Sequence, residues 1–104
     1  MRRPEIVNSV KNILHQVAPE ATAILYGSEA RGDAHEDSDI DVLVLLDKEK
    51  VTQNDREQIA YPVYHIGYNT DTVISVMFYT KQSWEGNMRI TPFYHNVMRE
   101  GIVL

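Results

Sequence analysis

The chain has 104 residues, enough for one hydrophobic core but too few for a second module of ordinary size, so we expect a single domain over residues 1–104. It contains no cysteine, which excludes a disulfide framework and a thiolate metal site and suits a reducing cytoplasm. The formal charge of −5 argues against a general nucleic-acid binder, and no apolar run approaches the roughly 20 residues of a membrane-spanning helix. We therefore expect a soluble cytoplasmic domain with no membrane contact and no direct nucleic-acid binding.

The first part of the chain predicts a helix, a buried strand and a short helical turn. Apolar residues recur at helical spacing over Pro4–Val17, and proline suits the first position of a helix. The partly β-branched run Thr22–Tyr26 predicts a buried strand that stops at a Gly-Ser pair. Residues 28–31 then predict a single helical turn, which Gly32 ends.

The middle of the chain predicts an interior strand followed by a helix. The run Ile40–Leu46 is apolar on both faces beyond its one acidic position, as a strand covered on both sides should be. A helix is expected in the first half of residues 51–68, with Thr52 or Asn54 as its N-cap. Pro62 is expected to kink or end that helix, because it lacks a backbone N–H and its ring clashes with the preceding turn.

The last third predicts a strand over residues 72–80 and a short helix or turn over residues 81–87. A final helix is indicated by Thr91 at the N-cap, Pro92 at the first position and Gly101 just past the end. The order of elements predicts an α/β (α+β) fold with a small mixed β-sheet flanked by helices.

The aromatic side chains are expected mainly inside the protein. Trp84 and the tyrosines are interpreted as core or sheet-covering residues, with a partner surface as the alternative. Residues 93–95, Phe-Tyr-His, are a candidate interface element. His15, His65 and His95 share no ligand spacing, so a histidine zinc site is not expected.

The negative charge is concentrated in one segment. Residues 29–41 contain six acids against one base, Arg31, so this segment alone carries the net charge of the chain. Such a segment fits a site that collects cations, and it equally fits a solvated acidic loop. The six acids are Glu29, Asp33, Glu36, Asp37, Asp39 and Asp41.

Asp39 and Asp41 are candidate metal ligands at the mouth of the apolar strand. Side chains two apart on a strand point to the same face, so the two carboxylates project together while Ile40 turns into the core. Adjacent carboxylates repel unless one is protonated or a cation lies between them. Mg²⁺ is commonly held by one or two carboxylates with phosphate oxygens and water. A solvated strand end is the alternative for an isolated Asp-x-Asp.

Gly27 and Ser28 are candidate phosphate-binding residues. A glycine lets the backbone approach a phosphate closely, and the N–H groups of a turn entering a helix point at the anion. Ser28 adds a hydroxyl donor. Arg31 could neutralise a phosphate, or it could pair with Asp33 or Glu29. A Gly-Ser pair alone is usually only a turn, but here it precedes the paired aspartates with strands on the proper sides.

The segment GSEARGDAHEDSDIDVLV resembles the signature of the DNA polymerase β-like nucleotidyltransferase superfamily. The resemblance is closest to the stand-alone minimal nucleotidyltransferases, including the antitoxin partners of HEPN toxins, and it spans nearly the whole chain. It implies the nucleotidyltransferase fold, with Asp39 and Asp41 as catalytic residues that hold Mg²⁺ (or Mn²⁺). It also implies ATP as substrate, with its phosphates on Gly27, Ser28 and Arg31.

The pattern departs from the superfamily at a third carboxylate, which usually comes from a later strand and helps to activate the attacking hydroxyl. The position with apolar neighbours on both sides is Ser75. Asp71 has the same parity but lies four residues earlier, roughly 13 Å back along an extended strand. Either Asp71 reaches the site through a different strand geometry, or the third acid is absent.

Two functions are compatible with these features. The first is transfer of a nucleoside monophosphate, AMP from ATP, to a hydroxyl on a partner protein. By resemblance, this partner is a small helical HEPN-type toxin with an acceptor tyrosine, which makes the chain an antitoxin. The second is a nucleotide-binding antitoxin or subunit that transfers slowly or not at all and acts by contact. A homo-oligomer is compatible with either function.

Overall fold

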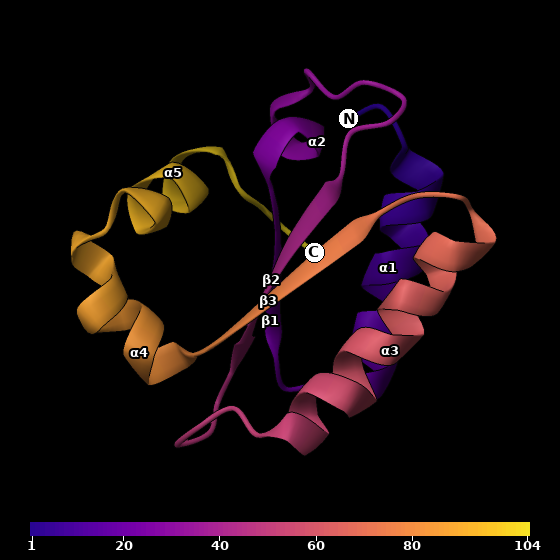
Figure 1. The fold of residues 1–104 in the computed structure, drawn as a ribbon. Helices are drawn as coiled ribbons and strands as arrows, with labels where there is room; N and C mark the ends of the chain where they lie inside the picture. The colour runs from indigo at the N-terminus through magenta and orange to yellow at the C-terminus, as the bar shows by residue number, and fades with distance from the viewer.

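The computed structural model describes all 104 residues and is built around one four-stranded mixed sheet with helices on both faces (Figure 1). The strand order is β3-β2-β1-β4. Helices α1 and α3 cover one face, and α4 and α5 cover the other (Figure 1). No helix combines the length and the apolar character needed to cross a membrane. The elements are α1 (Pro4–Val17), β1 (Thr22–Tyr26), α2 (Gly27–Arg31), β2 (Ile40–Leu46), α3 (Gln53–Asn69), β3 (Ile74–Thr80), α4 (Lys81–Glu85), the 3₁₀ helix η1 (Asn87–Ile90), α5 (Pro92–Glu100) and β4 (Ile102–Val103).

Strand β2 is interior to the sheet and is buried on both faces. Every residue from Val42 to Leu46 is buried, as the uninterrupted apolar run predicted. β2 pairs antiparallel with β1, which places Tyr26 opposite Asp41. It pairs parallel with β3, which places Asp41 opposite Ser75. The acidic end of β2 therefore has a strand on each side.

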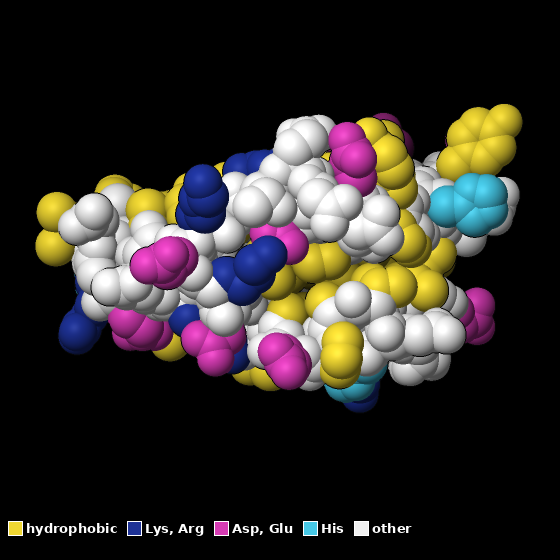
Figure 2. Space-filling view, turned by 90° about the horizontal axis from the view of Figure 1, so that it is seen from below, with side chains coloured by type: hydrophobic (Ala, Val, Ile, Leu, Met, Phe, Trp, Pro, Cys, Tyr) yellow, Lys and Arg dark blue, Asp and Glu magenta, His cyan; other side chains and the backbone are white.

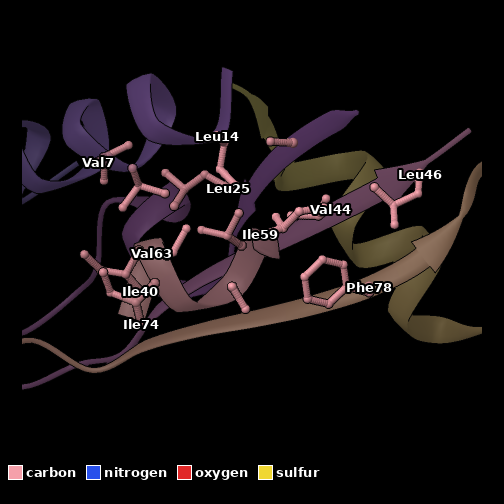
Figure 3. Close-up of a cluster of buried hydrophobic side chains, with 14 residues drawn as sticks. Val7, Leu14, Leu25, Ile40, Val44, Leu46, Ile59, Val63, Ile74 and Phe78 are labelled. Carbon is pink, nitrogen blue, oxygen red and sulfur yellow. The ribbon is translucent and has the colours of Figure 1, made fainter. Parts of the chain in front are cut away.

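The larger hydrophobic core lies between the sheet and helices α1 and α3 (Figure 3). Each helix contributes residues at helical spacing, such as Val7 and Leu14 from α1 and Ile59 and Val63 from α3. Burying an aliphatic side chain of this size stabilises the folded state by about 1.5–3 kcal/mol. The sheet side chains that meet these helices include Leu25, Ile40, Val44, Leu46, Ile74 and Phe78.

The second core, under α4 and α5, is largely aromatic. Trp84 is 1% exposed, which confirms its predicted core position. Phe93 and Tyr94 pack against Trp84, with ring centroids 5.7 and 4.8 Å away. Both rings are only partly buried and His95 beside them is exposed, so an interface role of residues 93–95 stays a prediction.

Three tyrosines of α3 are exposed rather than buried, so the core interpretation is wrong for them. Tyr61, Tyr64 and Tyr68 are 60%, 44% and 86% exposed. Ile59 and Val63 face the sheet, and Tyr61 lies two residues from each of them. With 3.6 residues per turn, that offset places its side chain on the opposite face of the helix.

Helix α3 continues through Pro62, so the expectation of a helix confined to the first half of its segment is wrong. Val63 and Gly67, beyond the proline, are buried. This tertiary packing offsets the backbone hydrogen bond that Pro62 cannot donate. The N-cap is Thr52, whose hydroxyl accepts from the N–H of Asp55 while the Asp55 carboxylate accepts from the N–H of Thr52.

One strand boundary differs from expectation, and one short strand was not expected. β3 begins at Ile74, two residues late, because the chain first makes a tight turn after α3. In that turn Asp71 adopts a left-handed conformation, with φ of 53°, and the N–H of Thr72 donates to the carbonyl of Gly67. Strand β4 was not expected, since two residues are too short to show a periodic pattern. It forms by pairing with β1.

Candidate active site

The Gly-Ser turn between β1 and α2 lies directly against the carboxylate of Asp41. Tyr26, the last residue of β1, is paired with Asp41 on β2, and the chain then turns at Gly27 with φ of +75°. A Cβ atom at Gly27 would lie 2.5 Å from Oδ2 of Asp41, closer than any real contact allows. Only glycine fits this close approach. The fold therefore brings the predicted phosphate-binding turn and one predicted metal ligand together.

Asp39 and Asp41 occupy alternate positions at the start of β2, as predicted. Asp39 is exposed just before the strand, and Asp41 is half-buried within it. Burial is the main cause that raises the pKa of Asp41, and the negative charge of Asp39 raises it further. The positive charge of Arg31 opposes this shift only in part. The two carboxylates thus repel each other, and Arg31 compensates their negative charge only in part.

The position beside Asp41 on the neighbouring strand is Ser75, as the sequence indicated. Asp71 lies in the turn before β3, and no three residues among His, Cys, Asp and Glu are grouped so that they could hold a metal ion. The alternative that Asp71 reaches the site is therefore wrong. The site contains two carboxylates, and the neutral hydroxyl of Ser75 occupies the position at which the superfamily usually has a third acid.

Arg31 lies on the solvent side of α2 and bridges it to α5. Its Nε donates to Oδ2 of Asp33 at 3.2 Å, and its Nη1 donates to both carboxylate oxygens of Glu100 at 3.2 and 3.4 Å. The pairing with Asp33 was one predicted alternative and is confirmed. The pairing with Glu100 was not foreseen, because the two residues are 69 positions apart. These hydrogen bonds raise the pKa of Arg31, and the one to Asp33 has the largest effect.

Glu29 faces away from Arg31 and is fully buried, so it does not belong to an exposed acidic loop. Its carboxylate accepts hydrogen bonds from the backbone N–H groups of Arg2 and Arg3 and from Nε of Arg3. Burial alone would raise its pKa, but these hydrogen bonds outweigh burial and hold the pKa below its ordinary value. The sequence did not indicate this role for Glu29, and the two arginines at the start of the chain were its only signal.

Two aromatic rings pack together beside the β1 end of the site. The ring of Tyr26 meets that of Phe93 edge to face, with centroids 5.3 Å apart. Burial, followed by the negative charge of Asp41, raises the pKa of Tyr26 to about 12. The phenol therefore stays neutral at physiological pH and contributes no further negative charge beside Asp41.

The end of the molecule opposite α2 has no group of side chains of one charge like the paired carboxylates of the site. Figure 2 looks onto this end and shows acidic, basic and hydrophobic side chains interspersed. In the chain that follows β2, Lys48 donates to both oxygens of Asp55 at 2.7 and 2.8 Å. The paired carboxylates of the candidate site thus lie at the end that carries α2.

Comparison with known proteins agrees with this geometry. The family model described as nucleotidyltransferase domain matches residues 7–96. The chain belongs to this family. The nucleotidyltransferase fold and superfamily expected from the sequence are confirmed, and nucleotidyl transfer is the general reaction that the family supports.

This nucleotidyltransferase resembles one curated relative and several solved structures. MJ0141 of Methanocaldococcus jannaschii, which carries the provisional name protein adenylyltransferase, is 34% identical over 79 residues, which cover 74% of this chain and 79% of the relative. A crystal structure of a toxin-antitoxin with AMP-PNP has a TM-score of 0.61 at 20% identity and covers 92% of this chain and 69% of its own. A mutant of the toxin-antitoxin MntA-HpeT has the same TM-score at 21% identity, with 94% and 70% covered. The two crystal structures establish likeness of fold.

The donor set of this nucleotidyltransferase fits one Mg²⁺ ion. Asp39 and Asp41 offer two carboxylates whose mutual repulsion a divalent cation would relieve. Magnesium held by one or two carboxylates leaves its remaining positions to water and substrate phosphates. A second ion would need a further acid, and Ser75 does not supply one.

Proposed function

We propose that this nucleotidyltransferase transfers AMP from ATP to a hydroxyl group of a partner protein, with Mg²⁺ on Asp39 and Asp41. The observation that carries the proposal is the contact of Gly27 with the Asp41 carboxylate. This contact brings the Gly-Ser turn against one of the paired carboxylates, which supports a common site for the triphosphate and its metal ion.

Each residue of the turn has a distinct part in binding. Gly27 has no side chain, so the Asp41 carboxylate can lie against the backbone of the turn whose N–H groups would donate to phosphate oxygens. The Ser28 hydroxyl makes no hydrogen bond within the chain and can donate to a phosphate oxygen. Arg31 neutralises phosphate charge once it gives up part of its pairing with Asp33 and Glu100, all three of which face solvent at least partly.

The reaction is an in-line displacement at the α-phosphorus. The acceptor oxygen forms a bond to phosphorus and its proton passes to water, the bond to the bridging oxygen breaks, and pyrophosphate leaves. Bound Mg²⁺ would neutralise the charge that develops on the phosphate oxygens. Asp39 and Asp41 would hold the ion beside the Gly-Ser turn. Because Ser75 cannot take the proton of the acceptor as a carboxylate would, we expect slow transfer.

The acceptor in this proposal is a tyrosine of a HEPN-type toxin, with this chain as its antitoxin. One relative and two structural neighbours support this acceptor. The relative in M. jannaschii is named for adenylylation of protein, and the neighbours of similar fold come from toxin-antitoxin proteins.

A second candidate function is masking of the partner by contact, with nucleotide bound but not transferred. Ser75 beside Asp41 favours it, since catalysis that depends on a third acid would be lost.

One experiment separates these functions. The protein and its candidate partner are incubated with Mg²⁺ and ATP labelled at the α-phosphate. Label on the partner that disappears with Asp41→Asn supports transfer, and Asp37→Asn, an exposed acid of the same segment, is the matched control that should retain it. A tight complex without label supports masking, and label that survives Asp41→Asn refutes the assignment of the site.

A further inference from the structure

Glu29 is the one fully buried ionisable residue of the protein, and the proposed reaction gives it no chemical part. The only other buried polar side chain is that of Thr80. Burying a carboxylate is costly unless it is paired and hydrogen-bonded. A charge retained at this position, next to Ser28, therefore calls for a physical explanation.

The partners of Glu29 come from the start of the chain. Its Oε2 accepts from the N–H groups of Arg2 at 2.5 Å and Arg3 at 2.7 Å, and its Oε1 accepts from Nε of Arg3 at 2.9 Å. Arg3 is the N-cap of the 14-residue helix α1, whose dipole favours a negative charge at this end. The carboxylate thus caps α1 from a distant segment and ties α2 to it.

Helix α2 needs such external support. It has five residues, too few for a helix to be stable through its own hydrogen bonds. Its end is closed by the N–H groups of Gly32 and Asp33, which both donate to the carbonyl of Ser28. On the solvent side only the exposed Arg31 pairs hold it. The Glu29 carboxylate is its one buried polar anchor.

We propose that Glu29 is a positioning residue that holds the Gly27–Ser28 turn against Asp41 by anchoring α2 to the first residues of the chain. The proposal rests on the proposed function for its effect on nucleotide. Its effect on the structure of α2 is independent of that function. Loss of the carboxylate frees α2 to move, and displacement of a binding group by even about 1 Å weakens binding and catalysis strongly.

The test compares Glu29→Gln with Asp55→Asn. Both carboxylates accept a backbone N–H at the start of a helix and a bond from one basic side chain, but Asp55 does so in the segment after β2, at the far end of the sheet. The side-chain amide keeps the shape of the carboxyl group, so each variant should fold. Amide hydrogen exchange is measured by NMR at Gly32 and Asp33, and Mg·ATP affinity by calorimetry.

We expect Glu29→Gln to accelerate exchange at Gly32 and Asp33 and to weaken Mg·ATP binding, each by at least about tenfold, while exchange in β2 stays unchanged. Asp55→Asn should lower thermal stability without either effect. Arg3→Met should reproduce the Glu29→Gln pattern more weakly, because two backbone donors remain.

The proposal is overturned if Glu29→Gln leaves α2 exchange and nucleotide affinity like those of Asp55→Asn, or if exchange accelerates uniformly through the molecule. If the wild-type protein binds no Mg·ATP, the proposed function fails. Exchange at Gly32 and Asp33 then decides alone whether Glu29 positions α2.

Discussion

A methyl group on Gly27 would occupy the place of the Asp41 carboxylate, 2.5 Å from its Oδ2. Gly27→Ala should therefore displace that carboxylate and add backbone strain at a φ of +75°, which costs about 1–3 kcal/mol. We expect lower stability in urea unfolding and loss of Mg·ATP binding in calorimetry.

Gly32→Ala is the matched control for this change. Gly32 also has a positive φ, of +86°, but a Cβ there would meet its nearest atom only at 3.8 Å. The control should show the strain and keep Mg·ATP binding. Equal loss of binding in both variants would show that strain in α2, rather than the clash with Asp41, is responsible.

Asp41→Asn should abolish transfer without destabilising the protein at neutral pH. The pKa of Asp41 is raised by burial and by Asp39, so the folded protein binds this proton more tightly than the unfolded chain. The wild-type protein therefore loses stability as pH rises from the ordinary aspartate range through the raised pKa, and the variant does not. Urea unfolding at several pH values should show the variant gaining relative stability across that interval.

Stabilisation by Mg·ATP is a second measurement that compares the wild-type protein with Asp41→Asn. Mg·ATP should raise the melting temperature of the wild-type protein and not that of Asp41→Asn, because a ligand stabilises only the state that binds it. An equal rise in both proteins would place the ion elsewhere.

Ser75→Asp should create the third carboxylate beside Asp41. Without metal, the added negative charge should lower stability through repulsion with Asp41. With Mg²⁺, we expect a larger stabilisation by metal and faster AMP transfer, measured with labelled ATP. Ser75→Asn is the control of similar size, and it should change neither the stabilisation by metal nor the rate of AMP transfer. Unchanged transfer in Ser75→Asp would show that proton removal from the acceptor does not limit the rate.

Tyr26 offers a spectroscopic probe of the charge on Asp41. Its pKa of about 12 is due first to burial and next to Asp41. Asp41→Asn should therefore lower the pKa of Tyr26, followed by NMR titration of the tyrosine ring carbons. Tyr26→Phe identifies the signal by its disappearance. A pKa that stays near 12 in Asp41→Asn would mean that burial alone sets it.

Local sequence signals were sufficient to predict most of the elements and the two halves of the site. Helical spacing predicted α1 within its observed bounds, and the apolar runs did the same for β1 and β2. Alternation of side chains along β2 placed Asp39 and Asp41 on one face. The Gly-Ser dipeptide directly after β1 indicated the turn. These features depend on neighbours in the chain, so they can be recognised without knowing the fold.

Contacts between distant segments were decided only by the tertiary structure. Glu29 and Arg3 are 26 residues apart, and Arg31 and Glu100 are 69 residues apart. No local pattern shows which of several acids turns inward to meet an arginine, since that depends on how α1, α2 and α5 pack around the sheet. The persistence of α3 through Pro62 has the same origin, because burial against the sheet outweighs a local preference that the sequence displays clearly.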